Sequence, residues 1–553
     1  MNQTILIVGA GPTGLLMGCH LLRQGVDVRV IEKRATSISH SKALTINCAS
    51  LKLLHDLGVS DSIQQTAQRV DDIYVHWQGR DFLHIDFRHV DEHFNYLAMQ
   101  PQPVTEQAIL KQFEALGGEV DREVELVDII ENNSDYVSVR LHHVKDQTEE
   151  ICSFSYLVGC DGGKSRVRDE LGFSFTGLNY DMYFILADLS VDWDGPRDKV
   201  HYFVEEDCFL ILIPLTGDKH RIVIKVDGEY QEEGDTPPLE LFQQYAARIG
   251  PAGMKLHDPI WISSAPFYNR ITSDNVSGRC FLAGDASHLF SPIGGLGMNT
   301  GLQDAANLAW KLGLVMKGRM NPAVLESYRD ERLFMAGQLL AHTDRSTQLI
   351  SRLNPDVEAL EPLWPKMSNR RFFRYGMAQQ TGGTSQFYHL SDFVRDDRNQ
   401  AIGQNIQPGQ MAPFVKEITY GQKSVDSQEF YGRGALSILL FADTGDTKML
   451  AELMDALPDI SREYLRIFVI TEKPVVSDVI VEAVDLIVDA GQKIKRAYDA
   501  RDGDMFMIRP DLYIGYAGNM NFLNSIKIYF QRYFAPLQHS VETTERLVSE
   551  NVE

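Results

Sequence analysis

The sequence predicts a mixed α/β fold for this 553-residue chain, and three features support the prediction. A β-rich run at residues 4–8 leads into a glycine-rich turn and then into an apolar pattern at helical spacing. Residues 180–226 become strand-like, with alternating or continuous apolar side chains. Beyond Gln400, apolar strands alternate with helices again. Because a chain of this length is too long for one core, we expect two or three domains.

The composition excludes several classes of partner. The chain has 53 Lys and Arg against 76 Asp and Glu, which gives a formal charge of −23. This balance argues against a nucleic-acid or anionic-membrane partner, although backbone N–H groups can hold phosphate inside an acidic protein. No apolar run approaches the roughly 20 residues of a membrane span, and no Lys or Arg precedes the apolar amino end. We therefore expect a cytoplasmic protein with neither a signal peptide nor a membrane partner.

The six cysteines show no metal-binding pattern. No two of them have CxxC spacing, which disfavours a metal cluster or a disulfide scaffold. Reduced thiols in a cytosolic protein fit this distribution better, and no metal ion is expected.

The first functional motif stands at the amino end. Residues 9–14 read Gly-Ala-Gly-Pro-Thr-Gly, a GxGxxG sequence between a strand and a helix. In such a turn Gly9 permits the tight bend, Gly11 lets a pyrophosphate reach the backbone, and Gly14 brings helix and strand together. The second strand ends in Glu32, 23 residues after Gly9, where an acid can accept hydrogen bonds from an adenosine ribose. These features predict a Rossmann-type dinucleotide site, and the motif alone does not separate NAD from FAD.

The second motif lies at residues 156–168, which read Tyr-Leu-Val-Gly-Cys-Asp-Gly-Gly-Lys-Ser-Arg-Val-Arg. An apolar strand again ends in an acid–glycine turn, Asp161-Gly162, and a basic helix start follows. Arg166 and Arg168 could face a pyrophosphate, or they could be solvated surface charges.

The third motif, at residues 280–312, reads CFLAGDASHLFSPIGGLGMNTGLQDAANLAWKL. It starts as a buried strand, continues through Asp285 and a cluster of glycines, and becomes helical beyond Asn299. Asp285 can accept hydrogen bonds from ribityl-type hydroxyls, the glycines let a flat ligand approach the backbone, and the helix start favours a developing anion. The alternative is a buried strand–turn–helix with an ordinary N-cap. His288 fits a packed or hydrogen-bonded histidine better than a catalytic base.

In this order the three motifs resemble the FAD-dependent aromatic hydroxylases, single-component flavoprotein monooxygenases of the para-hydroxybenzoate hydroxylase type. The resemblance covers about residues 1–345 and rests on the combination of motifs. It implies a Rossmann-type FAD-binding domain, with the first motif on the ADP half of FAD and Asp285 on the flavin ribityl chain. It also implies that the Pro292 carbonyl faces substrate and flavin, while the backbone from Gly297 to Asn299 meets the pyrimidine ring.

The resemblance assigns roles residue by residue. The residues implied to act in catalysis are Pro292, Gly297, Met298 and Asn299. The residues implied to bind FAD are Gly9, Gly11, Pro12, Thr13, Gly14, Glu32, Lys33, Arg34, Lys42, Gln102, Asp161, Gly162, Arg166, Asp285, Gly295, Gly297, Met298 and Asn299. Gln102 in QPVTE fits the family's glutamine before a TE pair, with Gln100 as the other register. Lys42 stands where the family often has Arg, so it keeps the charge and loses the bidentate fork.

The implied reaction is a monooxygenation. FAD, reduced by NADPH or NADH as a transient co-substrate, would react with O2, and a flavin C4a-hydroperoxide would pass one oxygen atom to a phenolic or polycyclic aromatic substrate. An epoxidase, a Baeyer–Villiger enzyme, a halogenase or a non-catalytic flavin-binding protein on the same fold stays open. The halogenases carry a WxWxIP signature, and the five tryptophans here include no WxW pair.

Strand-like segments beside these motifs predict a separate β-sheet that covers the flavin and makes the substrate pocket. Tyr183, Tyr202 and Phe209 lie in these segments and could line that pocket, although most aromatic side chains at strand positions are core.

The carboxyl region resembles the thioredoxin-like C-terminal domain of phenol hydroxylase relatives. Strands are expected at 436–441 and 465–470, and a helix at 449–457. No cysteine lies after residue 280, so dithiol chemistry is excluded and a structural or dimerising role, compatible with a homodimer, is favoured. The expected domains are the FAD-binding domain at 1–72, 103–179 and 275–345, the substrate-binding β-sheet domain at 73–102 and 180–274, a helix and linker at 346–400, and the thioredoxin-like domain at 401–540.

Overall fold

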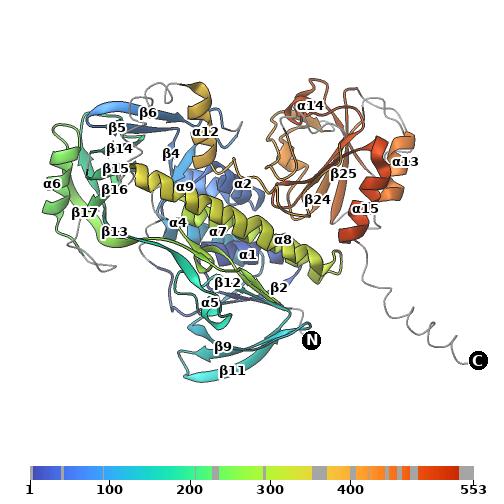
Figure 1. The fold of residues 1–553 in the computed structure, drawn as a ribbon, viewed down its shortest axis with the longest axis horizontal. Coiled ribbons are helices and arrows are strands. Elements are labelled where there is room, and N and C mark those ends of the chain that lie inside the picture. Colours follow the sequence, from blue (N-terminus) through green and yellow to red (C-terminus); the bar gives the residue numbers. More distant parts are fainter. Residues whose placement is uncertain are drawn as a thin grey trace, which may run out of the picture. The chain divides into compact units, whose positions relative to one another are not determined.

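The computed structural model confirms the mixed α/β fold. It describes residues 4–38, 43–90, 93–205, 207–226, 236–290, 294–350, 370–398, 406–420, 423–442, 447–457, 464–473 and 484–534. The described residues belong to two compact units (Figure 1). The first unit draws on Met1–Cys19, Arg29–Ala305 and Leu333–Gln386, and the second on His20–Val28, Ala306–Arg332 and Phe387–Glu553.

A six-stranded sheet lies in the first unit, with the strand order β18-β19-β12-β1-β2-β8. Its strands are β1 (Thr4–Val8), β2 (Asp27–Glu32), β8 (Val120–Arg122), β12 (Tyr156–Gly159), β18 (Val276–Ser277) and β19 (Cys280–Leu282). Strand β1 runs parallel to β12, and β12 runs parallel to β19. Their apolar runs are buried, as expected for parallel strands that are covered on both faces. The sheet therefore brings the carboxyl ends of β1, β12 and β19, and the three motifs that follow them, to one edge.

Smaller elements surround this sheet. The helices are α1 (Pro12–Arg23), α2 (Cys48–Asp56), α3 (Ser60–Thr66), α4 (Gln102–Ala115) and α5 (Arg166–Glu170). Two three-stranded sheets, ordered β3-β7-β4 and β11-β10-β9, complete this part. Their strands are β3 (Thr45–Ile46), β4 (Gln68–Val70), β7 (Leu97–Met99), β9 (Val124–Asn132), β10 (Val137–His143) and β11 (Thr148–Phe154).

The strand-rich middle of the chain forms an eight-stranded sheet with the order β20-β17-β13-β16-β15-β14-β5-β6. Its strands are β5 (Asp72–Trp77), β6 (Arg80–Asp86), β13 (Phe175–Asp192), β14 (Val200–Val204), β15 (Phe209–Pro214), β16 (Lys219–Val226), β17 (Lys255–Thr272) and β20 (His288–Leu289). Helix α6 (Leu239–Ile249) lies along one face of this sheet (Figure 1), where Phe242 packs into a core with Phe203 and Leu210.

Because successive side chains of a strand point to opposite faces, Tyr202 and Phe209 lie on the face away from α6. On that face Phe209 packs against Phe184, with ring centroids 5.6 Å apart. Tyr183 instead packs against the core under α6. Of the three aromatic residues predicted for the pocket, Tyr183 therefore lies on the face opposite the other two.

His201 on β14 is expected to make the stability of this sheet depend on pH. The residue is 2% exposed, and its ring stacks with the rings of Tyr74 and Phe203. The Nδ1 atom of His201 lies 3.0 Å from the Nε2 atom of His76. Burial, and then the nearby His76, lower the pKa of His201 to about 4. In the unfolded chain the pKa returns to about 6.5, so the unfolded state takes up the proton first as the pH falls, and stability is lost between about pH 6.5 and 4.

We therefore expect the free energy of unfolding to fall by about 2 kcal/mol between pH 7 and pH 5 through this group. Urea denaturation at both pH values, compared for the wild type and His201→Phe, measures the effect. The phenyl ring keeps the stacking and carries no proton, so the variant should lose that part of the pH dependence. An unchanged pH dependence in His201→Phe would contradict the assignment.

Helical segments follow the third motif. They are α7 (Leu296–Met316), the 3₁₀ turn η2 (Pro322–Leu325), α8 (Glu326–Tyr328), the π-helical turn η3 (Arg329–Leu333), α9 (Phe334–Ile350) and α12 (Arg371–Thr381). No helix in the described ranges is both long enough and apolar enough to span a membrane.

The second unit contains another eight-stranded sheet, with the order β21-β28-β27-β24-β25-β26-β22-β23. Its strands are β21 (Arg395–Asp396), β22 (Ile418–Tyr420), β23 (Lys423–Val425), β24 (Leu436–Phe441), β25 (Leu465–Thr471), β26 (Asp485–Val488), β27 (Asp504–Ile508) and β28 (Ile514–Asn519). Its helical elements are the short turns η4 (Ser427–Glu429) and η5 (Met520–Phe522) and the helices α13 (Thr447–Ala456), α14 (Lys493–Ala497) and α15 (Leu523–Phe534). The strand predicted at 436–441 is confirmed as β24, and the strand predicted at 465–470 is confirmed as β25.

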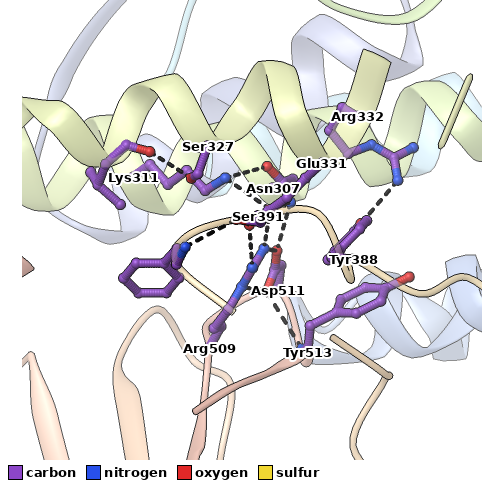
Figure 2. A network of polar contacts seen from close by, with 12 residues as sticks. Asn307, Lys311, Ser327, Glu331, Arg332, Tyr388, Ser391, Arg509, Asp511 and Tyr513 are labelled. Atoms are coloured by element: carbon purple, nitrogen blue, oxygen red, sulfur yellow. Dashed lines mark hydrogen bonds and ion pairs between the residues drawn. The ribbon is translucent and has the colours of Figure 1, made fainter. Parts of the chain in front are cut away.

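A buried ionic network lies inside this second unit (Figure 2). Glu331 in η3 accepts two hydrogen bonds of 2.8 Å from Arg509 and one of 2.9 Å from Lys311, and all three side chains are 0% exposed. Asn307 and Ser391 donate to the same carboxylate at 2.7 and 2.8 Å. Although burial alone would raise it, Arg509 and Lys311 hold the pKa of Glu331 well below its usual range. Glu331 is therefore a buried carboxylate that stays ionised among five donors.

Candidate functional site

The β1–α1 turn has the geometry that the GxGxxG spacing predicts. Gly9 has φ +107°, and a Cβ there would lie 2.4 Å from the Cys160 carbonyl oxygen. A Cβ on Gly14 would lie 2.0 Å from the Gly9 oxygen, so only glycine lets helix α1 approach β1 this closely. A Cβ on Gly11 would meet nothing within 4 Å. The turn therefore leaves open space in front of Gly11, where a pyrophosphate can approach the backbone.

Glu32, at the end of β2, is 5% exposed and turned toward this bend. The Ala10 N–H donates to it at 3.2 Å. The Arg34 side chain donates at 2.8 and 3.1 Å, and the Arg34 backbone N–H at 3.1 Å. Although burial raises it, these bonds from Arg34 hold the pKa of Glu32 below its usual value. Lys33, between the two, is exposed.

The two candidate glutamines differ in what their side chains do. Gln100 is 1% exposed, accepts from Thr66 Oγ1 at 2.8 Å and donates to Thr105 Oγ1 at 2.8 Å. Gln102, the first residue of α4, is only partly buried. The Gln100 side chain is therefore committed to internal bonds with α3 and α4.

The Asp161-Gly162 (DG) turn after β12 is stabilised by hydrogen bonds to the Asp161 carboxylate. Asp161 accepts from Ser165 Oγ at 2.5 Å and from the Val167 N–H at 3.1 Å, and burial raises its pKa. Gly162 has φ +84° with nothing within 4 Å of a Cβ. The Arg166 side chain donates to the Val127 carbonyl at 2.8 Å and lies on the surface. The Arg166 guanidinium is thus directed to β9 in this structure.

Arg168 connects the Asp161-Gly162 (DG) turn of the second motif to the Gly284-Asp285 (GD) turn of the third. It is 5% exposed and donates to the Ala286 carbonyl at 3.1 Å and to the Gly163 carbonyl at 2.9 Å. Its guanidinium also lies 3.9 Å from the centre of the Phe175 ring. The sequence placed Arg168 beside a pyrophosphate or on the surface, whereas in the structure it holds two motif turns together.

The Gly284-Asp285 (GD) turn is held in place by a buried pair of side chains, Asp304 and His288. Asp304 on α7 accepts from the Gly284 N–H at 2.9 Å and pairs with His288 Nε2 at 2.6 Å, and both side chains are 1% exposed. His288 Nδ1 is buried without a hydrogen-bond partner in the described structure. His288 is hydrogen-bonded, as the sequence suggested. Asp285 lies in the turn η1 (Gly284–Ala286), and its side chain is exposed.

The start of α7 leaves a second open space. Gly295 has φ +63°, and a Cβ there would lie 2.8 Å from the Thr45 Cβ. A Cβ on Gly297 would meet nothing within 4 Å. The Asn299 side chain donates to the Thr45 carbonyl at 2.8 Å and accepts from the Asn47 N–H at 3.0 Å, so it pins β3 to the helix start. Met298 is partly buried. The backbone N–H groups of this first turn are free of intrahelical bonds, which suits an anionic ring edge.

Tyr202 connects the eight-stranded sheet to this glycine cluster. The backbone of Gly294 bonds to its hydroxyl, and burial raises the pKa of Tyr202 to about 12. The face of the sheet away from α6 is therefore the face next to the start of α7. Pro292 and Lys42 lie outside the described residues.

These residues fit an extended flavin dinucleotide. Open space lies in front of Gly11, Gly162 and Gly297, one glycine in each motif. Pro12 is the first residue of α1, a position that proline favours, and Thr13 packs against Gly284 and Gly301, so the first and third motifs touch. No group of three or more His, Cys, Asp or Glu within the described ranges is arranged to hold a metal ion.

Sequence reasoning missed the Glu106 side chain and the pairing of His288 with Asp304. Glu106 is 2% exposed, and its Oε2 atom has no hydrogen-bond partner in the described part of the chain. Its only sequence signal was the TE pair that follows Gln102, which drew attention to the glutamine instead.

Comparisons with known proteins agree with this geometry. A model of the FAD binding domain family matches residues 2–343. The pentachlorophenol 4-monooxygenase of Sphingobium chlorophenolicum is 28% identical over 536 residues, which cover 93% of each chain. The 6-methylpretetramide 4-monooxygenase of Streptomyces rimosus is 33% identical over 469 residues, 81% of each chain. The solved structure of an anhydrotetracycline hydroxylase from Streptomyces rimosus has a TM-score of 0.74 at 24% identity, and the match covers 97% of this chain and 100% of that one.

Proposed function

The chain belongs to the family of FAD-dependent aromatic hydroxylases and monooxygenases, and from this premise we propose that it inserts one oxygen atom from O2 into a phenolic or polycyclic aromatic substrate, with NADPH or NADH as reductant. When bound, FAD supplies the redox and oxygen chemistry, and the protein supplies position, exclusion of water and electrostatic fields. The observation that carries the proposal is the start of α7, where backbone N–H groups without intrahelical partners lie beside open space at Gly297.

Different residues of this chain are proposed to bind different parts of FAD. Gly9, Gly11 and Gly14 shape the turn for the pyrophosphate, and Asp285 accepts hydrogen bonds from the ribityl chain. The first turn of α7, from Gly297 to Asn299, stabilises negative charge on the pyrimidine edge. Asn299 acts by holding this turn against Thr45.

The aromatic substrate class rests on the relatives, and the sheet is compatible with it. The face that bears Tyr202 also carries Phe209 and Phe184, which are fully buried and pack against each other as an apolar layer. One relative is named for pentachlorophenol and another for 6-methylpretetramide. The first compound is a single phenolic ring and the second is polycyclic, so the proposed substrate class includes both.

We also propose a thioredoxin-like fold for residues 436–534. The order β25-β24-β27-β28, with β24 and β25 parallel and β27 and β28 antiparallel to their neighbours, supports it. The absence of cysteine beyond residue 280 leaves it a structural or dimerising role.

The test of the proposed function starts with the flavin. Purified protein should be yellow, NADPH or NADH oxidation should accelerate with a suitable polycyclic phenol, and the product should gain one oxygen atom by mass. Colourless protein that takes up no added FAD would overturn the proposal. FAD retention without reduction by either nicotinamide would favour a non-catalytic flavin protein.

Asp285→Ala tests the ribityl contact separately. Loss of a charge-assisted hydrogen bond should weaken FAD binding roughly tenfold to hundredfold. Asp146→Ala, an exposed acid in the turn between β10 and β11, is the matched control and should leave FAD affinity unchanged. Equal affinities in both variants would remove Asp285 from the site.

A further inference from the structure

We propose that Glu106 binds the adenosine ribose of FAD, next to Glu32, whose own acceptor positions are occupied within the protein. The inference rests on the proposed function, because it requires FAD in the nucleotide site. It names a residue on helix α4 that lies 74 positions beyond Glu32 in the sequence and reaches the same place in the fold.

The position of Glu106 is unusual for a carboxylate. The side chain is 2% exposed, and Ser37 donates a hydrogen bond to it. Its Oε2 atom has no hydrogen-bond partner in the described structure. Leaving a buried polar atom without a partner is unfavourable by about 1–3 kcal/mol, more for a charged group, so such an atom calls for a ligand or water.

The surroundings of Glu106 are those of the adenosine end. Glu32, Arg34 and Arg122 lie close enough to act on its charge. Glu32 is the residue that ends the second strand, where the dinucleotide fold places its ribose contact. The unpaired oxygen of Glu106 thus lies near the residue where the ribose is expected.

Glu32 has little acceptor capacity left for a ribose. An ionised carboxylate offers about four lone-pair positions. Four donors already use them: the Ala10 N–H, the Arg34 N–H, and Arg34 Nε and Nη2. A ribose hydroxyl that meets Glu32 finds these positions taken, whereas Glu106 Oε2 is unused.

A ribose hydroxyl suits either protonation state of Glu106. Burial, opposed by Ser37, Arg34 and Arg122, raises the pKa of Glu106. A hydroxyl both donates and accepts, so it can pair with the carboxylate or with the carboxylic acid. A ribose contact and a purely structural role for Glu106 predict different ligand selectivity.

The experiment compares FAD with FMN, which lacks the adenosine. Dissociation constants for both are measured on flavin-stripped protein by fluorescence titration, for the wild type, Glu106→Ala and Glu106→Gln. Glu106→Ala should weaken FAD binding roughly tenfold to hundredfold and leave FMN binding unchanged. Glu106→Gln keeps the volume and an acceptor oxygen, so its selective loss should be smaller. Glu114→Ala, exposed on the same helix, should change neither constant.

The outcomes separate cleanly. Equal losses for FAD and FMN, or no loss for either, would overturn the ribose contact. If Glu106→Ala fails to fold by circular dichroism, Glu106→Gln carries the test, and an unchanged ratio of the FAD and FMN constants there overturns it. Wild-type protein that binds neither flavin would refute the proposed function itself.

Discussion

Replacing Glu331 by alanine is expected to lower the free energy of unfolding of the second unit by about 3–5 kcal/mol. The substitution leaves the side chains of Lys311 and Arg509 buried. It removes the carboxylate that lies 2.9 Å from Lys311 Nζ and 2.8 Å from Arg509 Nη1. Arg509 keeps a bond from Nε to the Asp511 carboxylate at 2.9 Å, whereas Lys311 keeps a bond to the neutral Asn307 Oδ1 at 2.9 Å, so the Lys311 ammonium suffers the larger electrostatic loss. An uncompensated buried charge is far more unfavourable than a missing surface pair. Urea denaturation followed by the fluorescence of Trp310, which lies 5.3 Å from the Arg509 guanidinium, measures the change.

Glu326→Ala is the matched control because it removes another acid from the same stretch. Glu326 pairs with Arg329 at 2.9 Å, but its side chain is 64% exposed. Surface pairs of this kind contribute little, so the change should stay within about 0.5 kcal/mol. If Glu331→Ala is as mild as this control, the network does not stabilise the unit. Glu331→Gln, which keeps the shape and removes the charge, should fall between the two.

The network could not be predicted from the sequence because its members meet only in the folded chain. Glu331 and Arg509 are 178 positions apart. In sequence, Glu331 lies among charged neighbours and reads as part of a solvated helix face. No local pattern of apolar residues indicates that the turn between β27 and β28 buries Glu331.

The nucleotide motifs could be predicted because their constraints are local. Gly9, Gly11 and Gly14 lie within six residues, and each has the backbone freedom or the space that the spacing requires. The flanking strand and helix follow from their apolar periods. The mixed α/β fold and the FAD-binding family are confirmed, whereas the individual site residues stay predictions.

Side-chain partners were the limit of the sequence argument. The sequence favoured Gln102 and left Gln100 as the other register, and it could not show that the Gln100 side chain bonds to Thr66 and Thr105. Arg166 and Arg168 could both face a pyrophosphate, and only Arg166 was assigned to FAD, whereas in the structure Arg166 bonds to β9 and Arg168 to the Ala286 carbonyl. Charge and spacing indicate what a residue can bind, but the tertiary structure determines which partner it contacts.

Gly11→Ala and Gly14→Ala are expected to separate binding from folding within one turn. A Cβ on Gly14 would lie 2.0 Å from the Gly9 oxygen, which is backbone and cannot move aside, so this variant should lose about 1–3 kcal/mol of stability or more. A Cβ on Gly11 meets nothing within 4 Å, so the apoprotein should unfold as the wild type does. That methyl group would occupy the space in which the pyrophosphate approaches the backbone, so FAD affinity should fall roughly tenfold to hundredfold.

Thermal unfolding of the flavin-free proteins and FAD titration of each measure the two effects independently. Gly337→Ala, within α9 and with nothing within 4 Å of its Cβ, controls for the added methyl group and should change neither quantity unfavourably. Because the two motif glycines are three residues apart, a general loosening of the turn would move stability and affinity together in both variants. If Gly11→Ala binds FAD as the wild type does, the pyrophosphate lies elsewhere, and the open space in front of this glycine has another use.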